Sequence, residues 1–318
     1  MTEFQLPPPV FLDPSIARKR KLVSKLLQLT DQHIVLPGVI EISGSGVCNR
    51  KCSFCPRSAP DFKDVHEFID IHLLEKLFTQ LADLEYSGLI IYSGFVEPML
   101  DKGIFKKIAL THKLLPDSRI QLITNGDPLN TSRIRKLFTS GLTTLLISVY
   151  DGPEDEKRLK KMCQDATLSS EQYIIRNRYL PPEMDFGITM SNRGGTMDNT
   201  EYVRLSLSQP LNKTCFYPGY MFFMDYQGDV LICSHDWGKK SIIGNMVDND
   251  FLEIWLSEEM LKIREDLGQA RRKLSPCDVC DVRGSLIGRQ HALAWARHGN
   301  YQIVEDDEFV SKQDEKNA

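Results

Sequence analysis

The sequence predicts an α/β protein, a partial (β/α)6 TIM-like barrel followed by a small C-terminal domain built from a β-hairpin and a helix. Two observations support this fold class. From residue 39 to about residue 191, short β-rich segments alternate with helix-like runs, which is typical of a parallel sheet. After Gly194-Gly195 the pattern changes to strand, turn, strand and helix. About six βα units are too few for a complete (β/α)8 barrel.

Each expected element follows from its residues. Runs rich in β-branched and aromatic residues predict strands at 39–43, 88–93, 119–124, 143–149, 172–179 and 184–190. Apolar positions at helical spacing predict helices at 71–84, 103–115 and 131–141. In the C-terminal part we expect strands at 221–225 and 230–233 and one helix at 251–267. Functional residues of such a sheet should lie at the carboxyl ends of its strands.

These elements divide the chain into five parts. Residues 1–35 are expected to form an N-terminal extension, and residues 36–195 the barrel. Residues 196–212 are a linker and residues 213–285 the C-terminal domain. Residues 286–318 are expected to contain a helix and a polar, disordered tail.

Composition indicates a globular protein of the cytoplasm. The 318 residues are 42% hydrophobic and carry a net charge of −4, which gives no electrostatic basis for binding nucleic acid. The run Arg18-Lys19-Arg20-Lys21 opens an expected amphipathic helix, and we interpret it as a solvated helix face. No targeting segment or membrane span is predicted. Eight cysteines in such a chain indicate reduced thiols that bind metal rather than disulfides.

Three cysteines lie within eight residues, at Cys48, Cys52 and Cys55, directly after an apolar stretch. Three thiolates can hold three irons of a [4Fe–4S] cluster, and the fourth iron is then open to an outside molecule. An open metal position is typical of a reactive site rather than a structural one. The alternative is a zinc site that a fourth ligand such as His66 closes.

This C-x3-C-x2-C spacing, with Phe54 before the last cysteine, resembles the signature of the radical S-adenosylmethionine (SAM) enzymes. The resemblance implies that the open iron binds SAM. It also implies that an electron from the cluster cleaves SAM to methionine and a 5′-deoxyadenosyl radical, which takes a hydrogen atom from the substrate. An electron donor such as flavodoxin or ferredoxin would supply that electron.

Four further cysteines form a second set, at Cys215, Cys233, Cys277 and Cys280. Four thiolates would complete the coordination of a metal or cluster, with zinc again the alternative. With Gly228 in the expected hairpin turn, the set resembles the twitch module, the short form of the SPASM domain. The resemblance covers roughly residues 36–285 and implies a second [4Fe–4S] cluster beside the substrate.

Several strand ends resemble the SAM-binding segments of this family. The first, Tyr92 to Pro98, resembles the family's Gly-x-Gly-Glu-Pro segment, but Val96 replaces the second glycine. Because a β-branched residue resists positive φ, the geometry of this loop stays open. The resemblance implies SAM contacts from Gly94, Glu97, Asn125, Ser148 and Arg193. Asp151 is a weaker choice than Ser148, and Arg176 and Arg178 are alternatives to Arg193.

Other polar residues near the second set are candidates for substrate contact, namely His235, Asp236, Trp237 and Arg283. Cys163 belongs to neither cysteine set. We interpret it as a half-buried small hydrophobic residue of a helix at 154–166. The alternative is a hydrogen-atom donor, which an epimerase would need.

Together these features predict a radical SAM oxidoreductase or epimerase that acts on a small molecule, such as a sugar, an aminosugar or a cyclitol. Short twitch relatives include aminocyclitol dehydrogenases and sugar epimerases. A maturase of ribosomal peptides is an alternative. A zinc-binding protein without catalytic activity is an alternative from another class.

Overall fold

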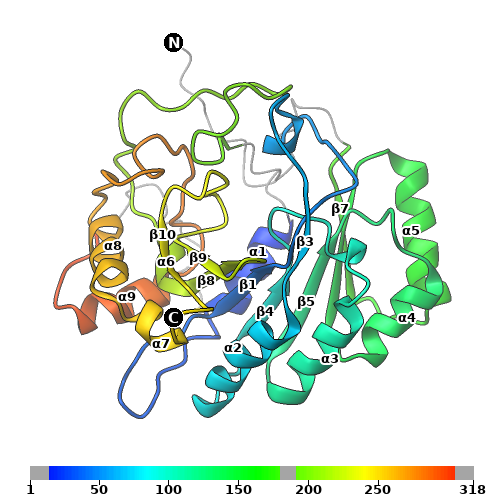
Figure 1. The fold of residues 1–318 in the computed structure, drawn as a ribbon, viewed down its shortest axis with the longest axis horizontal. Helices are drawn as coiled ribbons and strands as arrows, with labels where there is room; N and C mark the ends of the chain where they lie inside the picture. The colour runs from blue at the N-terminus through cyan, green and yellow to red at the C-terminus, as the bar shows by residue number, and fades with distance from the viewer. Residues whose placement is uncertain (1–13, 180–190, 305–318) are drawn as a thin grey trace, which may run out of the picture.

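The computed structural model describes residues 14–179 and 191–304. Its centre is one mainly parallel sheet in the order β10-β9-β8-β1-β4-β5-β6-β7, with helices packed along one face (Figure 1). The strands are β1 (Val39–Ser43), β4 (Leu89–Tyr92), β5 (Arg119–Thr124), β6 (Thr144–Val149), β7 (Tyr173–Asn177), β8 (Met221–Asp225), β9 (Asp229–Leu231) and β10 (Ile242–Asn245). The predicted α/β class with a parallel sheet is confirmed.

The helices follow the strands in the expected order. They are α1 (Pro14–Val23), α2 (Ile71–Asp83), α3 (Ile104–Leu114), α4 (Thr131–Thr139), α5 (Pro153–Asp165), α6 (Tyr217–Tyr220), α7 (Phe251–Trp255), α8 (Glu258–Gly268) and α9 (Arg289–His298). A short ribbon of β2 (Ser45–Gly46) and β3 (Val65–Phe68) stands beside the sheet, and 3-10 turns occupy η2 (Pro56–Ser58) and η3 (Pro98–Leu100). Among the described residues, no helix is both long and apolar enough to cross a bilayer.

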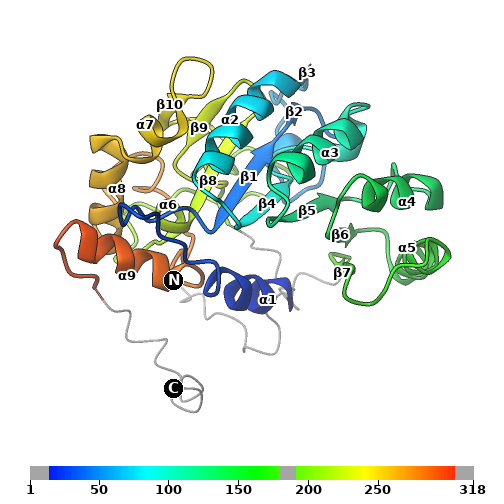
Figure 2. The same cartoon turned by 90° about the horizontal axis from the view of Figure 1, so that it is seen from below.

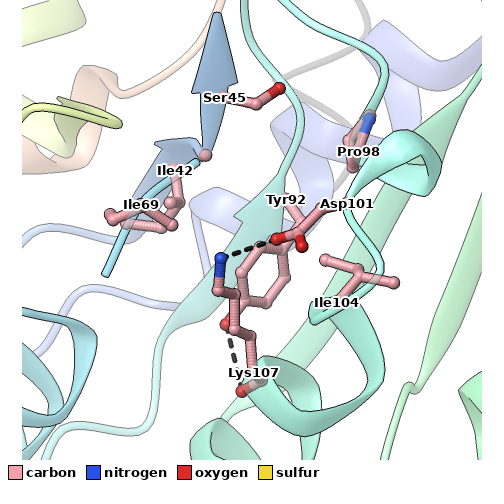
Figure 3. Close-up of a pocket in the computed structure, with 9 residues that line it drawn as sticks. Ile42, Ser45, Ile69, Tyr92, Pro98, Asp101, Ile104 and Lys107 are labelled. Carbon is pink, nitrogen blue, oxygen red and sulfur yellow. Dashed lines mark hydrogen bonds and ion pairs between the residues drawn. The ribbon is translucent and has the colours of Figure 1, made fainter. Parts of the chain in front are cut away.

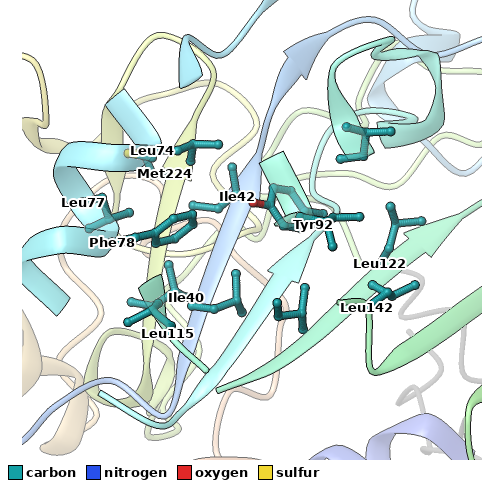
Figure 4. Packing of buried hydrophobic residues seen from close by; sticks show 14 of the residues in the cluster. Ile40, Ile42, Leu74, Leu77, Phe78, Tyr92, Leu115, Leu122, Leu142 and Met224 are labelled. Carbon is teal, nitrogen blue, oxygen red and sulfur yellow. The ribbon is translucent and has the colours of Figure 1, made fainter. Parts of the chain in front are cut away.

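The main hydrophobic core lies between the sheet and helices α2 to α5. Ile40 and Ile42 of β1 are fully buried and pack with Leu77 and Phe78 of α2 (Figure 4). The alternate residues of β1 point to the opposite face of the sheet, because side chains alternate along a strand. We call this opposite face the inner face.

Helix α1 lies across the inner face, on the opposite side of the sheet from α2 to α5 (Figure 2). Val23 is fully buried there in a second apolar cluster with Val39 and Phe223. Arg18 donates hydrogen bonds to Gln121 Oε1 of β5 at 3.0 Å and to Thr144 Oγ1 of β6 at 3.3 Å. The prediction of a solvated basic face is therefore wrong for Arg18, although Arg20 and Lys21 are exposed.

Two further expectations are corrected. The hairpin of the C-terminal part does not form a separate sheet, because β8 pairs in parallel with β1, with Glu41 opposite Phe223. The single helix expected at 251–267 is two helices, since Ser257 accepts a hydrogen bond from the Met260 N–H and begins α8 as its N-cap. The strand expected at 184–190 and the tail from residue 305 lie outside the described residues.

Candidate active site

The loop after β2 brings Cys48, Cys52 and Cys55 together at the carboxyl end of the sheet. All three are free thiols and half-buried. Burial, together with the nearby Cys55 and Cys48 thiols, raises the pKa of Cys52 to about 12. The Cys55 N–H donates to the Cys52 carbonyl at 2.9 Å, which closes a turn at the start of η2. The three thiols therefore converge, as ligands of one centre must.

Arg50 anchors this cysteine loop to two strand ends. Its guanidinium pairs with Asp127, which follows β5, at 2.5 Å and with Asp151, which follows β6, at 2.6 Å. It also lies over the Tyr150 ring, 5.2 Å from the centroid. Because the two carboxylates come from separate loops, the pairs fix the loop relative to the sheet.

We expect Arg50→Ala to speed the loss of the first cluster to a chelator by about tenfold, since outer partners of metal ligands are worth 10–100-fold. The measurement is the decay of iron–sulfur absorbance under anaerobic chelation. Lys51→Ala is the matched control, because Lys51 is exposed and makes none of these contacts. Equal decay rates in the two variants would contradict the anchoring role.

Glu97 joins the ends of β4 and β5. Its Oε1 accepts from Thr124 Oγ1 at 2.7 Å and from the Met99 N–H at 2.9 Å, and its Oε2 accepts from the Asn125 N–H at 2.7 Å. Only 2% of Glu97 is exposed. Burial raises the pKa of the Glu97 carboxyl to about 7, although these hydrogen bonds oppose the shift.

This carboxyl should make stability depend on pH. With a pKa of about 7 in the folded chain and 4.5 as the reference, Glu97 stabilises the fold most below pH 4.5 and loses that contribution as pH rises through 7. Between pH 5 and pH 8 we expect the wild type to lose about 2.5 kcal/mol relative to Glu97→Gln. Urea unfolding of the cluster-free protein at both pH values measures this difference, and parallel pH profiles would refute it.

The loop after β4 makes its sharp turn at Gly94. Gly94 has φ of +91°, and a Cβ there would lie 2.6 Å from Ser43 Cβ, so no other residue fits without movement. Val96 has no positive φ, and the turn therefore does not need the second glycine. On the next loop, Asn125 Nδ2 donates to Asn49 Oδ1 at 2.7 Å, which places Asn125 against the cysteine loop.

Two arginines reach the same region. Arg176 of β7 donates to Ser148 Oγ at 2.8 Å. Burial raises the pKa of the Cys55 thiol, and the charge of the nearby Arg193 opposes that rise. The Arg193 Nε is buried and has no hydrogen-bond partner within the described residues, which suits a group that awaits an anionic ligand.

A small closed cavity lies behind the Gly94–Pro98 loop (Figure 3). Its volume of about 10 Å³ is that of a single water molecule. Asp101 and Lys107 form an ion pair of 2.6 Å at its wall, and Ser45 Oγ is buried there without a partner among the described residues. The cavity is too small for a substrate. The residues that line it support the loop from behind.

The second cysteine set converges as well, beside the inner face. Burial raises the pKa of Cys233 most, and Cys277, Cys215 and Cys280 raise it further. Cys215 precedes α6, Cys233 follows β9, and the other two lie in the loop before α9. The His235 N–H donates to Cys233 Sγ and the Val282 N–H to Cys280 Sγ, both at 3.4 Å, as in iron–sulfur sites whose sulfurs accept backbone hydrogen bonds.

Both donor sets fit iron–sulfur clusters. The thiols are free and grouped as three and four, and neighbouring thiols raise the pKa of Cys52 and of Cys233, so metal ions would relieve the repulsion that follows deprotonation. In residues 14–179 and 191–304, no group of three or more His, Cys, Asp or Glu side chains is placed to bind a single metal ion. A cubane cluster does not require such a group, because each thiolate binds a different iron.

Of the remaining candidates, two are buried within the fold and a third packs against the Gly94–Pro98 loop. Cys163 is fully buried on the core-facing side of α5, on the opposite side of the sheet from α1, so its place is that of a core residue. Asp236 is also fully buried, and its carboxylate accepts from the Lys240 and Ser241 N–H groups in a tight turn. Trp237 packs on Phe95 with ring centroids 4.4 Å apart, which links the second cysteine set to the Gly94–Pro98 loop.

An α/β sheet with three convergent thiols at its carboxyl edge and four more beside its inner face defines a protein built to hold two iron–sulfur centres. The sequence profile of the Radical SAM superfamily matches residues 42–177, and that of the SPASM iron–sulfur cluster-binding domain matches residues 215–281. The chain therefore carries a Radical SAM domain and a SPASM-type domain.

Individual relatives agree with this assignment. The S-adenosyl-L-methionine-dependent 2-deoxy-scyllo-inosamine dehydrogenase of Niallia circulans is 28% identical over 242 residues, 76% of this chain and 90% of the relative. The crystal structure of BtrN in complex with AdoMet and 2-DOIA matches with a TM-score of 0.65 and 25% identity, over 78% of this chain and 94% of BtrN. Streptococcus suis SuiB bound to precursor peptide SuiA shares the fold at a TM-score of 0.51 and 17% identity, over 81% of this chain and 72% of SuiB.

The protein is therefore an enzyme, an oxidoreductase that uses SAM and two [4Fe–4S] clusters. Sequence reasoning found both cysteine sets and the strand-end loops. It missed Arg50, which lies inside the first cysteine motif, and the buried Glu41 of the inner face. Glu41 interrupts the otherwise apolar β1 strand, and that interruption was the available signal.

Proposed function

We propose that the protein oxidises a hydroxyl-bearing carbon of a small aminocyclitol or aminosugar to a ketone. Likeness to the 2-deoxy-scyllo-inosamine dehydrogenase supports the substrate class. The observation that carries the proposal is that Phe95 links the two thiol sets: its ring packs on Trp237, which follows Cys233, with centroids 4.4 Å apart, and its carbonyl accepts from Nε of Arg57, which follows Cys55, at 2.8 Å. A reactive centre on one side and an electron acceptor on the other suit a two-electron oxidation.

In this proposal Cys48, Cys52 and Cys55 would hold the cluster that binds SAM, and Cys215, Cys233, Cys277 and Cys280 would hold the auxiliary cluster. Gly94, Glu97, Asn125, Ser148 and Arg193 would contact SAM. When bound, SAM and its cluster supply a hydrogen-abstracting radical, and the auxiliary cluster accepts an electron. Arg193 would bind the SAM carboxylate, because its guanidinium matches a carboxylate and its Nε awaits a partner.

Oxidation is preferred to epimerisation because of Cys163. An epimerase must return a hydrogen atom to the substrate radical, and a thiol is the usual kind of donor among side chains. Cys163 is the free thiol outside both sets, and it is fully buried on the core-facing side of α5. We therefore propose that no thiol returns a hydrogen atom and that the substrate radical is oxidised instead.

Two further parts of the proposal concern the surroundings of the enzyme. The first cluster would receive its electron from a small carrier such as flavodoxin or ferredoxin. Eight free thiols would remain reduced in the cytoplasm, which we propose as the compartment.

The test is anaerobic reconstitution with iron, sulfide and SAM, followed by a panel of aminocyclitols, aminosugars, nucleotide sugars and a model peptide. We expect a ketone product and 5′-deoxyadenosine in equal amounts with an aminocyclitol or aminosugar. An epimer in place of the ketone, or turnover of the peptide alone, would overturn the proposal. A colourless protein that binds zinc and no iron would overturn it as well.

A further inference from the structure

One segment of the chain is hydrogen-bonded to the loops of both cysteine sets. We call residues 191–207 the strap, which runs along the top of Figure 1 in light green. The Tyr202 N–H donates to the Ser53 carbonyl at 3.0 Å, inside the first cysteine motif. The Glu201 N–H donates to Ser58 Oγ at 3.3 Å, just after that motif. The strap is therefore attached to the loop of the first set through its backbone.

The same strap is attached to the loop of the second set. The Leu207 N–H donates to the Val279 carbonyl at 3.0 Å, between the last two cysteines of that set. Asn192 Nδ2 donates to the same carbonyl at 2.6 Å, and the Asn192 N–H donates to Asp281 Oδ1 at 2.9 Å. Arg204 Nε pairs with the other oxygen of Asp281 at 2.6 Å. One segment of backbone thus connects the two cysteine loops directly.

Asn192 also shapes the turn that presents Arg193. Asn192 is fully buried, and its carbonyl accepts from the Gly195 N–H at 2.9 Å and from the Thr196 N–H at 3.0 Å. Arg193 has φ of +48°, in the left-handed region, where a residue other than glycine persists only if its surroundings fix it. The bonds of Asn192 to the loop of the second set supply part of that constraint. The position of Arg193 therefore depends on that loop.

We propose that Asn192 and Arg204 are positioning residues that couple the two sites, so that a filled second site strengthens SAM binding at the first. When its four thiols are bound, the loop of the second set is held in one arrangement. Asn192 and Arg204 pass that order to the strap. The strap passes it to the Ser53 carbonyl and to Arg193, the proposed partner of the SAM carboxylate. The inference rests on the ligand assignments of the proposed function.

A second link between the two sets offers a competing route. The Trp237 ring packs on Phe95, and the Phe95 carbonyl accepts from Arg57 Nε at 2.8 Å. This link includes neither Asn192 nor Arg204. A coupling that passes through Phe95 would therefore survive the loss of both positioning residues, and a coupling that passes through the strap would not.

A thermodynamic cycle tests the proposal. SAM affinity is measured anaerobically by equilibrium dialysis, without reductant or substrate. We expect Cys277→Ala to raise the Kd for SAM about tenfold, within the range usual for coupled sites. Saturating SAM overcomes this loss, so cleavage at saturation is unaffected. In an Asn192→Ala/Arg204→Met background, Cys277→Ala should change the Kd by less than about twofold, the limit within which independent sites add.

The ratio of the two Kd values separates coupling from general damage. A strap variant that is merely loosened would bind SAM weakly but would keep the tenfold effect of Cys277→Ala. Glu201→Gln is the matched control on the strap, because that side chain is exposed and makes none of these contacts, and it should keep the tenfold effect too. If the double variant does not fold, Arg204→Met alone should still reduce the ratio below that of the control. A ratio of one in the wild-type strap, or a ratio unchanged by the strap substitutions, would overturn the inference.

Hydrogen exchange provides a readout without SAM. In cluster-loaded Cys277→Ala we expect the Leu207 amide to exchange faster than in the wild type, because its acceptor loop is no longer held. The Tyr202 amide should also exchange faster, although its acceptor belongs to the first set. Faster exchange at Leu207 alone would show that the strap does not transmit order between the sites, which would contradict the inference.

This inference and the proposed oxidation fail in different ways. If the wild type shows the coupling but forms no ketone from any member of the panel, only the oxidation is wrong. If the wild type forms the ketone and its SAM affinity does not depend on Cys277, only the coupling is wrong. Iron analysis of each variant verifies that Cys277→Ala has lost the second cluster and kept the first.

Discussion

In the Cys52→Ala variant we expect no detectable 5′-deoxyadenosine and about half of the wild-type iron. Cys52 lies between Cys48 and Cys55, and both of these thiols raise the pKa of Cys52, so the three form one donor set. Two thiolates cannot hold a cluster that already leaves one iron without a protein ligand. The auxiliary cluster should stay, because none of its four cysteines lies in this loop. Anaerobic iron and sulfide analysis, with chromatography of the SAM products, measures both effects.

Cys163→Ala is the control for this experiment. Because Cys163 is in the core and belongs to neither set, we expect full iron content and unchanged product formation. Substantial SAM cleavage by Cys52→Ala would mean that another residue completes the first site. Loss of product by Cys163→Ala, with iron content intact, would restore the hydrogen-donor hypothesis.

The second large effect is expected from Cys277→Ala. Removal of this auxiliary thiol should leave SAM cleavage unchanged but reduce ketone formation by at least about 100-fold. Loss of an outer partner of a metal site already costs up to about that factor. The reason is that the substrate radical then has no electron acceptor. The measurement is the ratio of ketone to 5′-deoxyadenosine under anaerobic conditions. A wild-type ratio would exclude an electron-accepting role for the auxiliary set.

Gly284→Ala offers the same test without removing a ligand. A Cβ at Gly284 would lie 2.1 Å from Cys215 Sγ, so that thiol must move away from the other three. We expect Gly284→Ala to resemble Cys277→Ala. Gly219→Ala is the matched control, because the nearest atom to a Cβ there is 3.6 Å away, an ordinary contact. Loss of auxiliary iron in both glycine variants would indicate general disruption instead.

Local pattern was enough to predict most of the parallel sheet. The runs 39–43 and 119–124 are mostly buried and rich in β-branched and apolar residues, and β1 and β5 have these bounds. The pairing of β8 with β1 could not be predicted, because nothing in either strand specifies a partner far away in the chain. The break before α8 could have been predicted, since Ser257-Glu258-Glu259 is a helix start within a longer apolar pattern.

The candidate site was predictable where chemistry depends on residue spacing. Both cysteine sets were visible in the sequence because thiols at close spacing have few other uses in a reduced chain. The orientation of α1 was not predictable, because the run of four basic residues gives no indication of which ones face the sheet. The packing of Val23 and the hydrogen bonds of Arg18 determine that orientation, and both depend on tertiary contacts.

The pairing of β8 with β1 also has a consequence for synthesis of the chain. Val39 of β1 pairs with Met221, so one edge of this early strand has no hydrogen-bonding partner until most of the chain has left the ribosome. Pairing over such a separation is slow, and an uncovered strand edge is prone to join another molecule. Cys233, Cys277 and Cys280 follow the late strand. Closure of that edge therefore comes shortly before the auxiliary ligand set is complete, and until then nascent molecules are open to aggregation through β1.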